Sequence, residues 1–178
     1  MMFHRLKSIN KDQKGFTLLE LLLAFLIGAL IASGITAAIF QVVVGSARTN
    51  NHMIAVRQVQ SAGYWVSRDA QMAQNVTVGA ASGFPLTLSW IDSGGKTNQA
   101  IYSLENMSSG TLKQLRWTFS KTGETTKTDI IARFIDSAST SCALNNGVFT
   151  LNVTATVGPS SQRQTETRVY KIVPRPGS

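Results

Sequence analysis

Residues 21–40 read LLLAFLIGALIASGITAAIF, and this stretch decides what kind of protein the chain forms. It belongs to a longer segment, residues 21–47, in which none of the 27 residues is charged. As a helix rising ~1.5 Å per residue, the segment is about 40 Å long, more than the ~30 Å hydrocarbon core of a bilayer. A secretory signal has a shorter apolar core, roughly 7 to 15 residues, followed by a small-residue cleavage site. Length therefore favours a retained membrane helix over a signal cut near Ala32-Ser33-Gly34 or Ala37-Ala38.

The segment before the apolar run is basic. It holds Arg5, Lys7, Lys11 and Lys14, with Asp12 as its only acid. Basic residues beside a single apolar segment stay in the cytoplasm. We therefore expect a single pass through the cytoplasmic (inner) membrane, with the N-terminus inside and the bulk of the chain outside.

The junction between the two segments reads Lys14-Gly15-Phe16-Thr17-Leu18-Leu19-Glu20. A carboxylate inside a membrane helix costs about 2.5 to 3.5 kcal/mol on insertion scales and usually marks function. In the first helical turn Glu20 also faces the positive end of the helix dipole, which lowers that cost. If the chain is cut after Gly15, the new amino group of Phe16 lies about 6 Å of helix rise from Glu20.

This junction resembles the N-terminal signature of type IV prepilins, which pilins share with the pseudopilins of type II secretion. The resemblance implies that a prepilin peptidase/methyltransferase cuts the chain between Gly15 and Phe16 and N-methylates Phe16. It also implies that Glu20 pairs with the Phe16 amine of a neighbouring subunit. The alternative for Glu20 is a helix-start residue of a plain membrane anchor. The implied partners are other pilin or pseudopilin subunits, the inner-membrane assembly platform and the membrane itself.

Beyond the apolar run the helix becomes one-sided. Small or apolar residues recur here at spacings of 3, 4, 3, 4 and 3 and form a stripe along the helix: Val56, Val59, Gly63, Val66, Ala70 and Ala73. We expect Ala62, Trp65, Met72 and Val76 to widen this stripe. This period predicts an amphipathic helix, and no proline interrupts a single helix over residues 17–75.

The rest of the chain changes to strand-like patterns separated by turn clusters. We expect strands at residues 86–91, 100–104, 114–119, 130–135, 148–157 and 167–173, and a polar loop at residues 158–166. Such strands form an antiparallel sheet with one apolar face, which the helical stripe covers. The expected fold class is α+β, with one long N-terminal helix packed on an antiparallel sheet, as in the pilin fold.

We expect three parts: a basic leader (residues 1–15), the membrane-spanning and assembly half of the helix (16–45) and an extracytoplasmic globular domain (46–178). The resemblance implies a structural subunit of a type IV pilus or a type II secretion pseudopilus. The alternatives are a pilus-tip subunit that captures DNA or a surface, and a membrane-tethered domain that never assembles. Residues 66–73, VSRDAQMA, resemble the late first helix of minor pilins and J-type minor pseudopilins. The single cysteine excludes the C-terminal disulfide loop common in major pilins.

Candidate residues for chemistry are few, so we expect no enzyme, cofactor or metal site. One cysteine excludes an internal disulfide and a multi-cysteine zinc site, and two histidines argue against a His-based metal cage. Asp69 lies at the margin of the apolar stripe, and we expect a structural partner such as Arg116 or Arg133, or simple exposure, rather than a catalytic role. Cys142 is expected to be a free thiol near a loop, with an intermolecular bridge as the alternative. The net charge of +8 is spread along the chain, which favours a solvated surface over a DNA-binding patch.

Overall fold

The computed structural model describes residues 15–175. Within them the chain forms one α-helix, one 3-10 turn and eight strands, and it divides between Val43 and Val44 into two compact units. Helix α1 (Leu18–Met72) runs through this division. The predicted helix is confirmed, and it ends slightly earlier than expected because the Gln74 amide already bonds to the sheet, at the carbonyl of Ser89.

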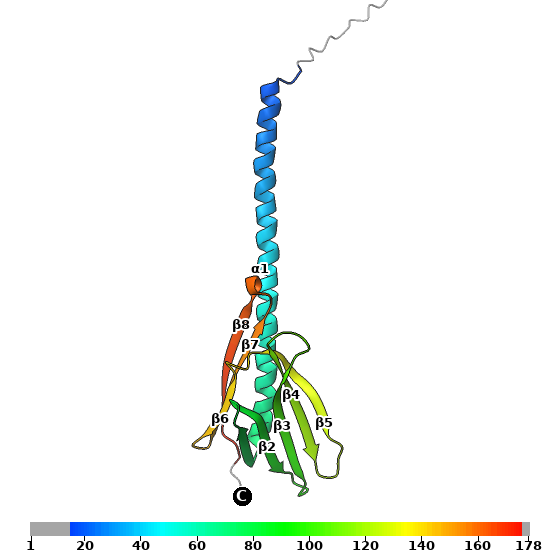
Figure 1. Cartoon of the computed structure of the whole chain (residues 1–178), viewed down its shortest axis with the longest axis vertical. Coiled ribbons are helices and arrows are strands. Elements are labelled where there is room, and N and C mark those ends of the chain that lie inside the picture. The colour runs from blue at the N-terminus through cyan, green and yellow to red at the C-terminus, as the bar shows by residue number, and fades with distance from the viewer. Residues whose placement is uncertain (1–14, 176–178) are drawn as a thin grey trace, which may run out of the picture. The chain divides into compact units, whose positions relative to one another are not determined.

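The second unit contains an antiparallel sheet that curls around the C-terminal part of α1 (Figure 1). Its strands are β1 (Asn75–Gly79), β2 (Gly83–Ile91), β3 (Thr97–Asn106), β4 (Lys113–Lys121), β5 (Lys127–Ile135), β6 (Ser141–Asn145), β7 (Val148–Val157) and β8 (Gln164–Ile172). They are arranged in the order β1-β2-β3-β4-β5-β7-β6, and β8 pairs with β7. The predicted α+β class and antiparallel sheet are therefore confirmed.

All six predicted strands are present, as β2, β3, β4, β5, β7 and β8. The five-residue strands β1 and β6 were not expected. The expected loop at residues 158–166 instead contains the 3-10 turn η1 (Ser160–Gln162) and the start of β8.

The sheet is nearly divided between β5 and β7, which pair only at Ile135 and Ala155. Near this junction α1 supplies hydrogen bonds to β5. The Ser61 hydroxyl donates to the Ile131 carbonyl at 2.6 Å, and the Arg133 amide donates to the Gln58 side chain at 2.7 Å. Polar side chains of the helix thus satisfy backbone groups that a full strand ladder would otherwise pair.

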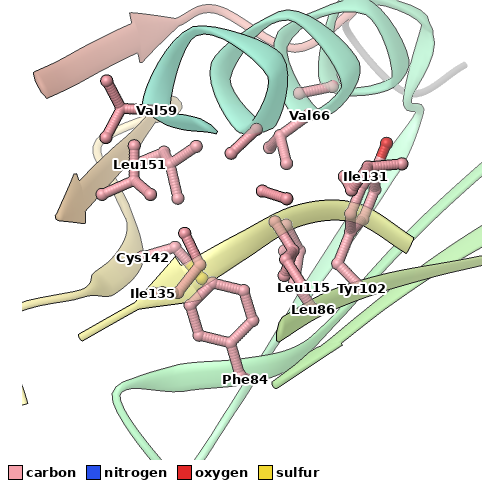
Figure 2. Close-up of a cluster of buried hydrophobic side chains, with 14 of the residues drawn as sticks. Val59, Val66, Phe84, Leu86, Tyr102, Leu115, Ile131, Ile135, Cys142 and Leu151 are labelled. Atoms are coloured by element: carbon pink, nitrogen blue, oxygen red, sulfur yellow. The ribbon is translucent and has the colours of Figure 1, made fainter. Parts of the chain in front are cut away.

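The core lies between α1 and the inner face of the sheet (Figure 2). The helix contributes the expected stripe, in which Val59, Val66 and Ala70 are fully buried. Facing residues of the sheet are Leu86, Leu88, Tyr102, Leu115, Ile135, Phe149 and Leu151. The expectation that Met72 widens the stripe is wrong, because its side chain is exposed at the end of the helix.

Gly63 lies where the Tyr170 ring of β8 packs against α1. A Cβ placed there would lie 2.0 Å from Cζ of Tyr170. The Tyr170 hydroxyl donates to the Val59 carbonyl at 3.1 Å. The absence of a side chain at residue 63 is therefore what allows the tyrosine ring to pack against the helix.

Candidate functional site

The candidate site is the start of α1, where the sequence predicted processing and assembly. The Thr17 hydroxyl accepts a hydrogen bond from the Glu20 amide at 3.2 Å, and the Glu20 carboxylate accepts one from the Thr17 amide at 3.4 Å. This reciprocal pair is a capping box, which satisfies amides that the first helical turn leaves without partners. Glu20 is therefore a helix-capping residue within its own chain, whatever further contact it makes.

Thr17 is the residue that the sequence prediction missed. The spacing Thr-x-x-Glu directly before an apolar run is the signal that would have found it. Gly15 and Phe16 precede the helix and are exposed, and the Phe16 side chain is 84% accessible. The Gly15–Phe16 peptide bond thus lies outside regular structure, in a form that a peptidase can bind. Cleavage there and methylation of Phe16 stay predictions.

The segment after this cap is apolar on every side, and no part of residues 15–175 covers it. The side chains from Leu18 to Phe40 are all exposed, and α1 is long and apolar enough to cross a membrane. Its two hydroxyl residues are satisfied inside the helix, because Ser33 donates to the Leu30 carbonyl and Thr36 to the Ala32 carbonyl, both at 2.8 Å. The segment therefore suits a hydrocarbon environment, which offers no hydrogen bonds.

Asp69, which the sequence placed at the margin of the stripe, is buried in the second unit with 1% exposure. The prediction that Asp69 pairs with Arg116 or Arg133 is wrong. Arg116 instead pairs with Glu105 at 2.6 Å. The two arginines lie in β4 and β5, and the sequence pattern does not give the position of these strands relative to α1.

The partners of Asp69 come from α1, β3 and β4. Oδ1 accepts from Arg68 Nε and Nη2, both at 2.8 Å, while Oδ2 accepts from the Tyr102 hydroxyl at 2.5 Å and from Trp117 Nε1 at 3.0 Å. Burial, together with the negative charge of Asp69, raises the pKa of Tyr102 well above its ordinary value. The phenol thus stays protonated and donates. A carboxylate with both oxygens occupied in this way stabilises the fold and is not placed for catalysis.

Cys142 is a free thiol, as expected, but it lies in β6 and is buried rather than beside a loop. Its Sγ donates to the Gly83 carbonyl at 3.1 Å, and burial raises the pKa of the thiol to about 12. A protonated thiol in the core is not available for an intermolecular bridge.

Part of the basic excess is neutralised inside the second unit. Four of its basic side chains form ion pairs with acidic ones: Arg68, Arg116, Lys121 and Arg168. Arg48 donates to the Ser161 carbonyl at 3.3 Å. These basic side chains are bound by groups of the same domain, so they do not support a DNA-binding surface.

Comparison with protein-family models gives one match, to the prokaryotic N-terminal methylation motif at residues 10–36. Comparisons with curated proteins and with solved structures give no significant match. The motif match spans Gly15, Phe16, the capping box and the first part of the exposed apolar segment. It lies at the start of a chain whose long N-terminal helix packs, by its C-terminal part, on an antiparallel sheet. Motif and fold together support a type IV prepilin-like protein.

Proposed function

We propose that this chain is a structural subunit of a type IV pilus or a type II secretion pseudopilus. The observation that carries the proposal is the apolar part of α1, which begins within the methylation motif, continues beyond it and is exposed on every side. Such a surface needs either lipid or other apolar helices around it. Transfer of the helix from the bilayer into a bundle of like helices keeps it out of water throughout assembly.

In the proposed pathway, residues 1–15 are a cytoplasmic leader that prepilin peptidase removes after Gly15. The new N-terminus, Phe16, is N-methylated, residues 16–45 anchor and then assemble the subunit, and residues 46–178 form its extracytoplasmic domain. Assembly takes place with other pilin or pseudopilin subunits at an inner-membrane platform. The resemblance of residues 66–73 to minor subunits favours a minor position in the filament.

Glu20 has two roles in this proposal. Its Oε2 atom caps its own helix through Thr17, and its charge attracts the Phe16 ammonium group of a neighbouring subunit. An ion pair is strengthened in a medium of low dielectric constant, so the pair favours docking inside the membrane over docking in water. The cap holds the carboxylate at the start of the helix, which is where the amine of the neighbouring subunit would bind.

Three variants separate the two roles. Glu20→Gln keeps a residue that can complete the capping box but removes the charge, Glu20→Val removes both, and Thr17→Ala removes only the threonine half of the cap. The readout is the share of the chain recovered in sheared filaments or, for a short pseudopilus, in cross-linked oligomers from the membrane.

We expect Glu20→Gln and Glu20→Val to lose most incorporation equally, and Thr17→Ala to keep most of it, because capping contributes only about 1 kcal/mol. Wild-type incorporation of Glu20→Gln would show that the charge is not needed for docking. Absence of the wild-type chain from every oligomer would contradict the structural role itself.

A further inference from the structure

On the outer side of the sheet there is a pocket of about 720 Å³, which has no role in the proposed assembly through the N-terminal helix. It lies where β5 and β7 diverge, between the loop after β3, the end of β5, and strands β7 and β8. This volume is within the range of small-molecule sites, roughly 300–1,000 Å³. Half of its lining residues carry a side-chain hydroxyl, whereas apolar residues usually dominate such sites.

Two cross-strand threonine pairs form part of the lining. Thr154 lies 2.8 Å from Thr167, and Thr156 lies 3.1 Å from Thr165, oxygen to oxygen. Thr154 donates its proton to the Ser139 carbonyl, so Thr167 is the donor in the first pair. In the second pair one hydroxyl donates to the other, which leaves one proton and several lone pairs for a ligand. The two threonine pairs are about 7 Å apart along the strands.

An aromatic residue lines the same pocket in a strained conformation. Phe134 has φ of 59°, in the left-handed region that bulky residues rarely adopt. Strain of this kind persists only where the surrounding structure imposes it, and it is concentrated at ligand sites. Phe134, together with Met107 and Leu112, forms the apolar part of the lining of this hydroxyl-rich pocket, and Phe134 is its one aromatic residue.

The charges of the lining argue against an ionic ligand. The lining has one carboxylate and one guanidinium, Asp136 and Arg163. The Asp136 carboxylate is already used within its own turn, accepting from the Ala138 amide at 3.0 Å and the Ser139 hydroxyl at 3.2 Å. A phosphate needs several cations or converging amides, and a divalent metal needs several carboxylates. Among residues 15–175, no three His, Cys, Asp or Glu side chains gather into a metal-binding group.

From this combination we infer that the pocket binds a neutral carbohydrate. Sugar hydroxyls both donate and accept, as the threonine hydroxyls do, and the C–H face of a sugar ring packs on an aromatic ring. The guanidinium of Arg163 supplies additional N–H donors at the same site. This inference is independent of filament assembly, since the pocket lies wholly within the second unit.

The test is saturation-transfer difference NMR on the full chain in dodecylphosphocholine micelles, because glucoside and maltoside detergents would supply a competing sugar. The probes are glucose, galactose, mannose and N-acetylglucosamine, with their β-1,4-linked dimers. We expect transfer to at least one of them, with a dissociation constant in the millimolar range, about 1 mM. Absence of transfer to every probe would overturn the inference, as would displacement of the bound sugar by inorganic phosphate.

Substitutions in the lining test whether the sugar binds in this pocket. The double change Thr156→Val and Thr165→Val removes the exposed hydroxyl pair and is expected to weaken binding about tenfold. Phe134→Asn removes the ring but keeps a residue that tolerates positive φ, and it should weaken binding similarly. The control is Thr150→Val, on the same face of β7 but outside the pocket, which should leave binding unchanged. Equal binding by all variants would contradict the assigned site, and tryptophan fluorescence of each variant verifies that it is folded.

Discussion

The two parts of α1 are parts of one helix and differ in what covers them. Residues 18–43 present apolar side chains in every direction, and nearly all of them are exposed. In residues 44–72 one side of the helix forms an apolar stripe that is buried under the sheet, while Arg57 and Gln60 are exposed. The residues of the stripe are Ala55, Val59, Ala62, Val66 and Ala70. The second part obtains its partner from its own chain. The first part must obtain one from a membrane or from other subunits, and the following changes test this difference.

The largest effect is expected in the second unit, on removing Asp69. Asp69→Ala leaves Arg68, Tyr102 and Trp117 without their shared acceptor. Arg68 is half-exposed and can be solvated, so the main cost is the loss of the two hydrogen bonds that the Tyr102 and Trp117 side chains donate to the buried carboxylate. A hydrogen bond to a charged group contributes about 1.5–3 kcal/mol, so the free energy of unfolding is expected to fall by roughly 3–6 kcal/mol. Urea unfolding followed by tryptophan fluorescence measures it, since all three tryptophans belong to the second unit.

The control for this change is Glu105→Ala, which removes a half-exposed pair with Arg116. Its expected cost is about 1 kcal/mol or less, because solvent screens such pairs. A loss of the same small size for both variants would show that the Asp69 cluster does not hold the domain together.

A charge in the first part is expected to have a smaller but still large effect, on membrane insertion. Leu26→Lys places an ammonium group in the apolar segment and costs about 2.5–3.5 kcal/mol of insertion free energy. Carbonate extraction of membranes measures the fraction of chain that stays inserted. The matched control is Gln60→Lys, at an exposed position of the second part, which should remain fully inserted. Equal retention of both variants would contradict the membrane role of the first part.

Glycine-to-alanine changes compare the two parts at single positions. Gly63→Ala places a Cβ against the Tyr170 ring and is expected to destabilise the domain by about 1–3 kcal/mol. A Cβ on Gly28 meets nothing within 4 Å. Gly28→Ala should therefore leave the unfolding midpoint of the domain unchanged, with a helix propensity better by about 1 kcal/mol.

Thermal unfolding of both glycine variants measures this contrast, and a Gly63→Ala, Tyr170→Ala double mutant refines it. Removing the ring should make the added methyl group nearly neutral, giving a strong coupling between the two positions. Additive effects would contradict the close contact between α1 and β8.

The smallest effect concerns pH and is confined to the second unit. Burial raises the pKa of Cys142 from 9.0 to about 12. The unfolded chain loses this proton above about pH 9 while the folded chain retains it, so stability falls as pH rises through this window, by at most about 1.4 kcal/mol per pH unit. Thermal melts between about pH 8 and 10 should show a shallower decline for Cys142→Ala than for the wild type. Identical slopes would argue against a buried, protonated thiol.

The long helix and six strands were predictable because their periods extend over many residues. Strands β1 and β6 were not, since each has five residues and a mixed pattern, with Asn75 and Thr77 in one and Ser141 and Asn145 in the other. Pairing with β2 and β7 forms them, and such pairing depends on tertiary structure rather than local preference.

Gly15, Phe16 and Glu20 were named from their order along the chain, and their roles in cleavage, methylation and docking stay predictions. The hydrogen bonds between Thr17 and Glu20 were missed, although the Thr-x-x-Glu spacing indicates them. The partners of Asp69 could not be predicted from the sequence, because Tyr102 and Trp117 lie in strands whose position relative to α1 depends on the whole sheet. The same holds for the threonine-lined pocket, which depends on the register of β7 against β8.

The most direct measurement is N-terminal sequencing and intact mass of the chain recovered from membranes of its own cells. The account predicts a chain that begins at Phe16 and carries one methyl group on its amine, because the leader is removed and the exposed apolar segment is retained. A chain that still begins at Met1, or one cut near Ala38, would contradict it. The second of these outcomes would mean that the apolar segment is a signal that is discarded and takes no part in assembly.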